Sequence, residues 1–294
     1  QARACSLYCR VRNSRYAEVT AEQQHGPRKV VAHNDAADSG NPIHDDATAR
    51  RFNFTGALVP GVTVFGYLSG ALLREFGPAW LDDGAAHVRL RQPVYAGDTV
   101  TISTQTGTDS AGLPIITVDA LNPDGARCAI MSGTLAAIDD VVPDVPQGRV
   151  PPRRDLPARR RPATPAGFAG ERELGSFRTE FAAAAADDFL AGLQETEAVY
   201  RTGVTHPAWL LRQANLIVDR NFDLGPWIHV SSSIRNHARV HHGDTIEVRA
   251  RVQDLFERKG HEYADLDVAL LLDGDPARPA MRVLHRAIYR MAER

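Results

Sequence analysis

A histidine that follows an Asn-Pro turn is the best candidate for acid–base chemistry in this chain. The run reads Asp38-Ser39-Gly40-Asn41-Pro42-Ile43-His44, and Asn-Pro favours a turn. A histidine side chain exchanges a proton near neutral pH. His44 could therefore act as a general acid or base, or it could be a loop histidine held by structural hydrogen bonds.

A helix start follows at Leu58-Val59-Pro60-Gly61. The apolar sequence predicts a buried helix from Val62 to Phe76 that ends at Gly77-Pro78. The first N–H groups of a helix have no intrahelical partner and stand at its positive dipole end, where they can stabilise a developing oxyanion. With His44, the backbone at Gly61 and Val62 could support proton transfer next to a carbonyl. The alternative is a glycine that only permits tight packing of a core helix.

The elements that would position these groups occur twice. Val94 to Ile102 and Val240 to Val248 each carry a Gly-Asp turn before an alternating strand. The helix at Val62 to Phe76 has a counterpart at Ala208 to Asn221, with Pro207 in its first turn. Two further strands follow each turn, which we predict at Pro114 to Leu121, Cys128 to Ile138, Tyr263 to Leu272 and Arg282 to Tyr289.

The order of Asn41-Pro42-Ile43-His44 and Gly61 resembles the MaoC-like, or (R)-specific enoyl-thioester hydratase, family. The resemblance implies an α+β double hotdog fold, with two antiparallel sheets that each wrap around a central helix. Family members carry a catalytic Asp two residues before the Asn, and Ser39 occupies that position here. Asp38 lies one residue earlier and could replace it if the loop bulges.

The resemblance also implies an activity. The chain would be a lyase that hydrates a 2-enoyl thioester, or dehydrates a 3-hydroxyacyl thioester, on coenzyme A or an acyl carrier protein. His44 would hold the water together with Asp38 or Ser39, Asn41 would hydrogen-bond near the substrate, and Gly61 would bind the thioester oxygen. Because Ser39 departs from the family pattern, a hotdog thioesterase, a repurposed hotdog enzyme and an acyl-binding protein remain alternatives.

The two halves differ in their chemical residues. We predict a tail at 1–28, a hotdog domain with the site at 29–140, a Pro- and Arg-rich linker at 141–168 and a degenerate hotdog domain at 169–294. The second half lacks an Asn-Pro-x-His sequence, which predicts a single active centre. Tyr67, Trp209, Trp227 and His229 are candidates for the pocket walls, although large aromatic residues more often lie in a core. His206, before the second helix, could face the same cleft.

Composition narrows the function classes. With 294 residues, 43% hydrophobic residues and a net charge of −2, the chain has no basic excess that would favour nucleic acid or a membrane surface. No run approaches the roughly 20 apolar residues of a membrane span. Cys5, Cys9 and Cys128 form neither a disulfide framework nor a zinc pattern, and no Gly-rich nucleotide loop is present. We therefore expect a cytoplasmic protein without metal or cofactor, and we leave a homodimer open.

Overall fold

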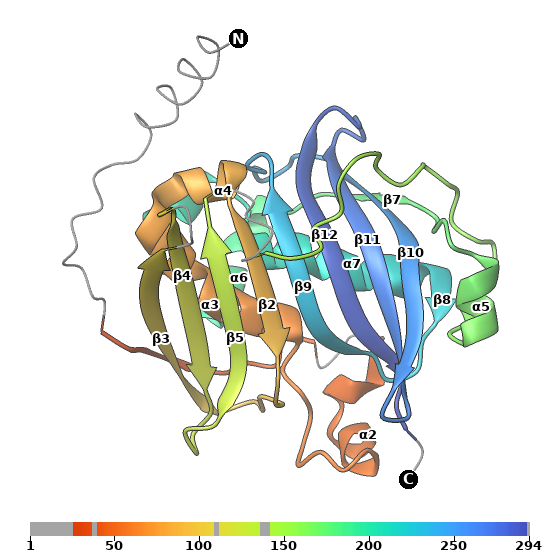
Figure 1. Ribbon diagram of the computed structural model, residues 1–294, viewed down its shortest axis with the longest axis horizontal. Helices are drawn as coiled ribbons and strands as arrows, with labels where there is room; N and C mark the ends of the chain where they lie inside the picture. Colours follow the sequence, from red (N-terminus) through yellow and green to blue (C-terminus); the bar gives the residue numbers. More distant parts are fainter. Residues whose placement is uncertain (1–25, 37–39, 109–111, 136–141, 293–294) are drawn as a thin grey trace.

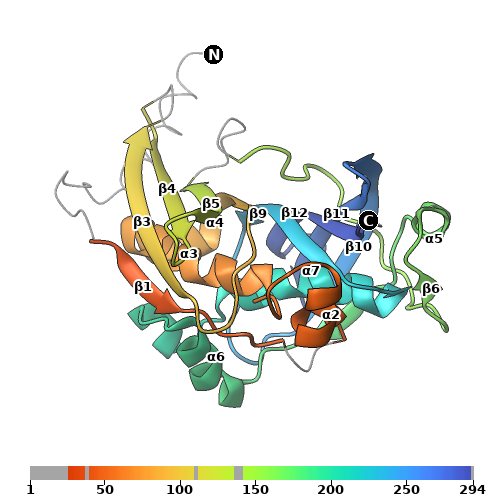
Figure 2. The ribbon, with the colours of Figure 1, turned by 90° about the horizontal axis from the view of Figure 1, so that it is seen from below.

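The computed structural model of the protein describes residues 26–36, 40–108, 112–135 and 142–292. Ten strands of this part form one antiparallel sheet in the order β1-β3-β4-β5-β2-β9-β12-β11-β10-β7 (Figure 1). The central helices α3 and α7 pack against each other on one face of the sheet, and α6 lies farther from it (Figure 2).

The first half supplies one side of this sheet. Its strands are β1 (Arg28–Val31), β2 (Ala85–Leu90), β3 (Thr99–Thr108), β4 (Pro114–Leu121) and β5 (Arg127–Thr134). Its helical segments are η1 (Pro42–His44), α2 (Asp46–Arg51), α3 (Gly61–Phe76), η2 (Gly77–Ala79) and α4 (Trp80–Asp83). Helix α3 ends where Gly77 takes a φ of 66°, a conformation that suits glycine, and Pro78 follows.

The second half repeats this order with additions. Its strands in the large sheet are β7 (Phe177–Thr179), β9 (Ile228–Asn236), β10 (Ile246–Arg258), β11 (His261–Leu272) and β12 (Pro279–Arg290). Its helical segments are α5 (Pro165–Gly170), η3 (Ala183–Ala185), α6 (Ala186–Leu193), η4 (Ala198–Thr202) and α7 (Pro207–Asn221). Strands β6 (Arg161–Pro162) and β8 (Phe222–Asp223) form a separate parallel pair.

The Gly-Asp turns show the internal repeat at atomic detail. Gly97 and Gly243 have φ values of 89° and 83°, which favour glycine. In each turn the aspartate carboxylate accepts the N–H of the residue three positions earlier, at 3.0 Å in the first turn and 2.7 Å in the second. The same local sequence therefore builds the same turn before β3 and before β10.

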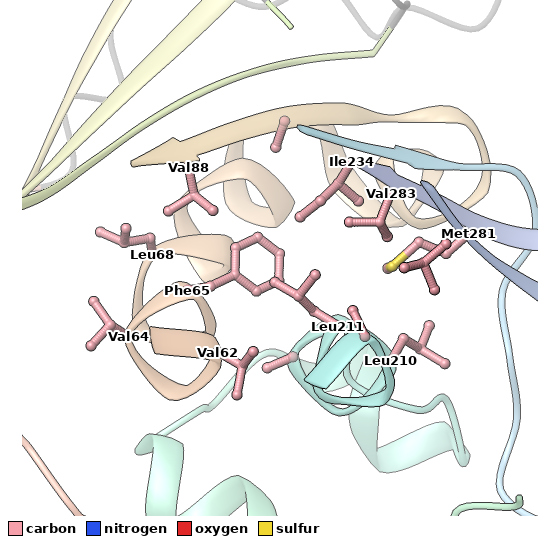
Figure 3. Packing of buried hydrophobic residues seen from close by; sticks show 14 of the residues in the cluster. Val62, Val64, Phe65, Leu68, Val88, Leu210, Leu211, Ile234, Met281 and Val283 are labelled. Atoms are coloured by element: carbon pink, nitrogen blue, oxygen red, sulfur yellow. The ribbon is translucent and has the colours of Figure 1, made fainter. Parts of the chain in front are cut away.

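The two halves share one core. Strands β2 and β9 pair antiparallel in the middle of the sheet, with Val88 opposite Ser232. Below this junction Phe65 of α3 and Leu211 of α7 are fully buried between the helices and the sheet, together with Val88 and Ile234 (Figure 3). Each half thus pairs the strand edge, with its backbone N–H and C=O groups, that the other half would expose.

The predicted double hotdog fold is confirmed, with one difference: the two predicted sheets are continuous through the β2–β9 pair. Helices α3 and α7 each begin one residue before the predicted start. Strand β5 ends at Thr134, and residues 136–138 of the predicted strand lie outside the described residues. None of the helices in the described ranges is long and apolar enough to span a membrane.

Residues 142–168, which the sequence assigns to a linker, run from the first half to the second. Within them Val142 and Val145 pack on Ala85, and Phe168 is fully buried. The Phe168 ring stacks on Phe222 with 4.1 Å between centroids. The segment is thus attached to both halves at several points.

Candidate functional site

Asn41 joins the site loop to the second half of the chain. Its side-chain amide pairs with the backbone of Trp227: Nδ2 donates to the carbonyl oxygen at 2.8 Å, and Oδ1 accepts the N–H at 3.1 Å. Oδ1 also accepts the Ile43 N–H, which caps η1. Because one Trp227 partner is a donor and the other an acceptor, the orientation of the amide is fixed. Asn41 therefore holds the histidine loop against the residue that precedes β9.

His44 ends η1 and is half-buried. Its Nδ1 lies 2.7 Å from the carbonyl oxygen of Leu58, which can only accept, so Nδ1 carries the proton. In the neutral ring Nε2 is then an acceptor, and it accepts a hydrogen bond of 3.3 Å from Asn41 Nδ2. Burial lowers the pKa of His44, and the Leu58 hydrogen bond and the Asp35 charge oppose this effect. A neutral imidazole with a fixed tautomer is suited to accept a proton.

The N-terminus of α3 lies beside this histidine. Thr63 and Val64 donate the first helical hydrogen bonds, to the Pro60 carbonyl oxygen. Pro60 is the N-cap residue, and its side chain cannot accept a hydrogen bond from the amides of Gly61 and Val62. The N–H groups of Gly61 and Val62 therefore have no partner within the helix. Such groups can bind a negatively charged oxygen.

A cavity of about 1200 Å³ brings these groups together. Asn41, His44 and Gly61 from the first half line it, and Trp227 and His229 line it from the second half. Its exposed basic residues are Arg51, Arg91 and Lys259. Among the described residues that line it there is no Asp or Glu. The cavity thus combines an apolar body, three histidines (His44, His229 and His261), a helix N-terminus and a positive rim.

A smaller cavity of about 240 Å³ adjoins the first and shares His44 and Asn41 with it. Asp35 lies here, where its carboxylate accepts the Thr63 hydroxyl at 2.7 Å and forms an ion pair with Arg212. Two strong partners make this carboxylate a weak candidate for a base. It stabilises the charged form of His44 instead, as the direction of its effect on the His44 pKa indicates.

The other predicted site residues lie in several places. Asp38 and Ser39 lie outside the described residues. Val62 is buried and its side chain lines the smaller cavity. Tyr67 is fully buried, and its hydroxyl accepts the His33 N–H at 3.0 Å. Neither Tyr67 nor Trp209 is among the residues that line the two cavities.

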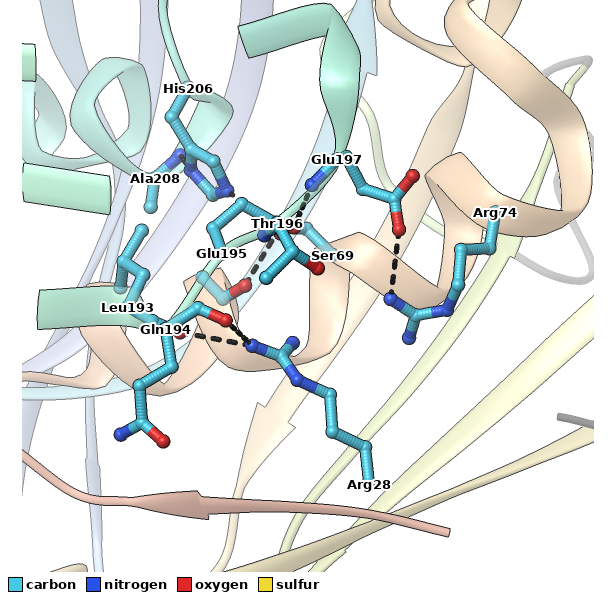
Figure 4. A network of polar contacts seen from close by, with 11 residues as sticks. Arg28, Ser69, Arg74, Leu193, Gln194, Glu195, Thr196, Glu197, His206 and Ala208 are labelled. Atoms are coloured by element: carbon cyan, nitrogen blue, oxygen red, sulfur yellow. Dashed lines mark hydrogen bonds and ion pairs between the residues drawn. The ribbon is translucent and has the colours of Figure 1, made fainter. Parts of the chain in front are cut away.

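His206 also lies away from both cavities. Its Nδ1 accepts the Ala208 N–H at 3.1 Å, and so caps α7. Its Nε2 lies 3.7 Å from the Glu195 carboxylate (Figure 4). Glu195 Oε1 accepts two backbone N–H groups, from Thr196 and Glu197. Burial raises the pKa of Glu195, but the nearby His206 ring and the backbone hydrogen bonds outweigh it and lower this pKa to about 2. His206 is thus part of a structural network.

Sequence reasoning named Trp227 and His229 only as wall candidates, and it missed Asp35 and Asn215. Asn215 lines both cavities, and its Oδ1 accepts the Trp227 indole N–H at 2.9 Å. The signal that could have found it is helical position: Asn215 is one of the polar residues on the otherwise apolar second central helix. Asp35 carried no comparable signal. No group of three or more His, Cys, Asp or Glu side chains in the described ranges is placed to hold a metal ion.

Comparisons with known proteins agree on the fold. No protein-family model matches the chain, and no curated protein matches its sequence. A structure described as a MaoC domain dehydratase from Chloroflexus aurantiacus is 13% identical, with a TM-score of 0.59 over 92% of this chain and 94% of that one. A MaoC-like dehydratase is 16% identical, with a TM-score of 0.58 over 92% and 100%.

A protein of Mycobacterium tuberculosis with a double hotdog fold is 13% identical, with a TM-score of 0.54 over 90% of this chain and 96% of that one. Structures described as thioesterases match as well. The chain therefore has a double hotdog fold similar to that of MaoC-like dehydratases. At these identities the similarity defines the fold, and activity has to be argued from the site.

Proposed function

We propose that this protein adds water reversibly to a 2-enoyl thioester and so forms a 3-hydroxyacyl thioester, with the acyl group on coenzyme A or an acyl carrier protein. The observation that carries the proposal is the position of a neutral, tautomer-fixed His44 beside the free first-turn amides of α3, in one cavity. These are a proton acceptor and an oxyanion site, the two parts that addition of water next to a thioester requires.

The residues would act in a defined order. His44 Nε2 takes a proton from a water that replaces its 3.3 Å contact with Asn41 Nδ2, while the water oxygen forms a bond to C3. The electrons of the C2–C3 double bond move toward the thioester, and the negative charge that develops on its oxygen is held by the N–H groups of Gly61 and Val62. The His44 imidazolium then returns its proton to C2. The reverse sequence removes water.

The cavity fits an acyl thioester on an anionic carrier. Its volume of about 1200 Å³ exceeds the roughly 300–1,000 Å³ typical of small-molecule sites, which leaves room for an acyl chain and a pantetheine arm. Arg51, Arg91 and Lys259 are exposed at its lining, where they would attract carrier phosphates or the acidic surface of a carrier protein.

We also propose one active centre per chain, in the half at 29–140, with the half at 169–294 closing the cavity and the segment at 141–168 joining them. The second half has His206 where the first has Pro60, before its central helix. This histidine is buried, accepts the Ala208 N–H through Nδ1 and faces the Glu195 carboxylate at 3.7 Å.

The test follows hydration of crotonyl-CoA and longer 2-enoyl-CoAs by loss of the conjugated thioester absorbance, with free thiol measured in parallel. We expect absorbance loss without thiol release, and a decrease of roughly 10²- to 10⁴-fold for His44→Ala. A similar decrease for Asp38→Asn would assign the second hydrogen of the water to Asp38, and wild-type turnover in this variant would leave that hydrogen to another acceptor of the cavity. Asp187→Asn with Asp188→Asn, on exposed α6 positions, is the control and should keep wild-type turnover. Thiol release without hydration would instead identify a thioesterase.

A further inference from the structure

His229 is a buried histidine of the second half that the mechanism above does not use. It lies on β9, is 6% exposed and lines the large cavity. A Cβ added at Gly61 would lie 2.7 Å from its Nδ1, so this nitrogen faces the N-terminus of α3. Nδ1 has no hydrogen-bond partner in the described structure.

A chain of hydrogen bonds fixes which His229 nitrogen carries the proton. Trp227 Nε1 can only donate, so the Asn215 atom 2.9 Å away is its oxygen. That oxygen also accepts from His285 Nε2 at 3.0 Å. In a neutral His285 ring Nδ1 must then be an acceptor, and burial does lower the pKa of His285 well below its usual value.

The same logic continues to His229. Ser232 donates its hydroxyl proton to His285 Nδ1 at 3.0 Å. The Ser232 oxygen is then free to accept from His229 Nε2 at 2.9 Å. Burial lowers the pKa of His229 to about 3, against the opposing effect of the Ser231 backbone, so the ring is neutral. Because Nε2 donates to Ser232, the lone pair is on Nδ1. The second half therefore presents a fixed hydrogen-bond acceptor toward Gly61.

An unpartnered buried acceptor is costly, roughly 1–3 kcal/mol, and the hydrogen-bond chain prevents His229 from avoiding this cost by changing tautomer. Its ring is also held by stacking on His285, with centroids 4.3 Å apart. The half-buried side chain of Leu90 covers the space between His229 Nδ1 and Gly61, since its Cδ1 would lie 2.2 Å from a Cβ added at Gly61. A change of the Leu90 rotamer would open Nδ1 to the cavity.

We propose that His229 Nδ1 is a second substrate contact: it accepts a hydrogen bond from the hydroxyl of a 3-hydroxyacyl thioester and, in the reverse direction, from the attacking water. A water has two hydrogens, and this assignment gives one to His44 Nε2 and the other to His229 Nδ1. The second acceptor then comes from the other half of the chain. This rests on the proposed function, because the hydroxyl and the water are those of that reaction.

The closing experiment measures binding, so that it remains informative without turnover. Affinities of 3-hydroxybutyryl-CoA and butyryl-CoA, which differ in one hydroxyl, are compared by calorimetry. Wild type should prefer the hydroxylated ligand by roughly 3- to 10-fold, the value of one neutral hydrogen bond. His229→Leu should lose this preference, while His229→Asn, which keeps an oxygen near the Nδ1 position, should retain part of it.

Two further variants separate this role from packing. Ser232→Ala leaves His229 in place but removes the acceptor for Nε2–H, which frees the ring to move its proton to Nδ1, so the preference should fall. His87→Asn is the matched control: His87 on β2 bonds Ser233 at 2.8 Å and is not among the residues that line either cavity. It should keep the preference.

Equal affinity of wild type for the two ligands, or an unchanged preference in His229→Leu, would overturn the proposal for His229. Failure of wild type to hydrate any enoyl thioester would overturn the proposed function instead. If hydration occurs, His229→Leu should lower kcat at least tenfold, and an effect on stability without any effect on kcat or on ligand preference would show that His229 is only structural.

Discussion

Gly61→Ala tests the geometry at the centre of the site with the smallest perturbation available. A Cβ at this position would lie 2.2 Å from Leu90 Cδ1, 2.7 Å from His229 Nδ1 and 3.0 Å from His229 Cβ. Its φ is not in the left-handed region, so alanine fits the backbone and the conflict is steric. Leu90 can rotate because it is half-buried, whereas His229 is held by Ser232 and His285.

The expected cost follows from these contacts. Overpacking of this kind costs about 1–3 kcal/mol, and the better helix propensity of alanine returns up to about 1 kcal/mol. We therefore expect a net loss of roughly 1–2 kcal/mol of unfolding free energy. The methyl group also fills space between Gly61, Leu90 and His229, which all line the cavity. Acyl-CoA affinity should therefore fall by about tenfold or more, which corresponds to about 1.4 kcal/mol.

The assay pairs urea unfolding with calorimetric titration of butyryl-CoA. Gly66→Ala is the control, because its Cβ would meet Leu193 of α6 at 2.7 Å and Ala208 of α7 at 3.1 Å. None of these residues lines either cavity. It should lose stability but keep affinity. If Gly61→Ala bound butyryl-CoA as wild type does, the placement of the thioester at this helix end would be refuted.

Three further outcomes follow from other parts of the structure. Asp267→Asn should lower the free energy of unfolding in urea by about 3–5 kcal/mol. Asp267 is fully buried and binds Arg282, which is 4% exposed, through two hydrogen bonds of 2.7 and 2.8 Å. A loss below 1 kcal/mol would contradict this. The lowered pKa of Glu195, about 2, contributes stability that is present above its unfolded pKa near 4.5 and is lost as pH falls toward 2. Between pH 6 and pH 3 wild type should therefore lose about 2 kcal/mol more unfolding free energy than Glu195→Gln. Parallel curves of unfolding free energy against pH would argue against this. Burial raises the pKa of the Cys128 thiol to about 11, so Cys128 of the native protein should not react with iodoacetamide at pH 8. Peptide mass spectrometry measures the alkylated fraction, and rapid labelling would show that β5 opens.

The sequence predicted the fold well because the fold depends on local signals. The Gly-Asp turns, the two apolar helices and the alternating strands are each encoded within about 15 residues, and they appear in the structure with small shifts at their ends. The pairing of β2 with β9 was not predicted. It joins segments that are more than a hundred residues apart, and no local pattern specifies it.

The site was predicted in part for the same reason. His44, Asn41 and Gly61 share a short motif, and the structure places them around one cavity. His229 and Asn215 reach that cavity only through the packing of the second half, which turns β9 toward the start of α3. His206 was predicted to face the cavity because it precedes the second helix as Pro60 precedes the first. In the structure its own half places it between Glu195 and the Ala208 N–H. That His44 acts on substrate stays a prediction.

The most direct test of the central claim, that His44 delivers a proton to C2 of an acyl thioester in this cavity, is deuterium incorporation. Wild type and His44→Ala are incubated with crotonyl-CoA in D₂O, and the products are analysed by mass spectrometry and NMR. The account predicts 3-hydroxybutyryl-CoA with one deuterium at C2, formed by wild type roughly 10²- to 10⁴-fold faster than by His44→Ala. Wild-type protein that forms no such product, or a His44→Ala variant that forms it at the wild-type rate, would contradict the account.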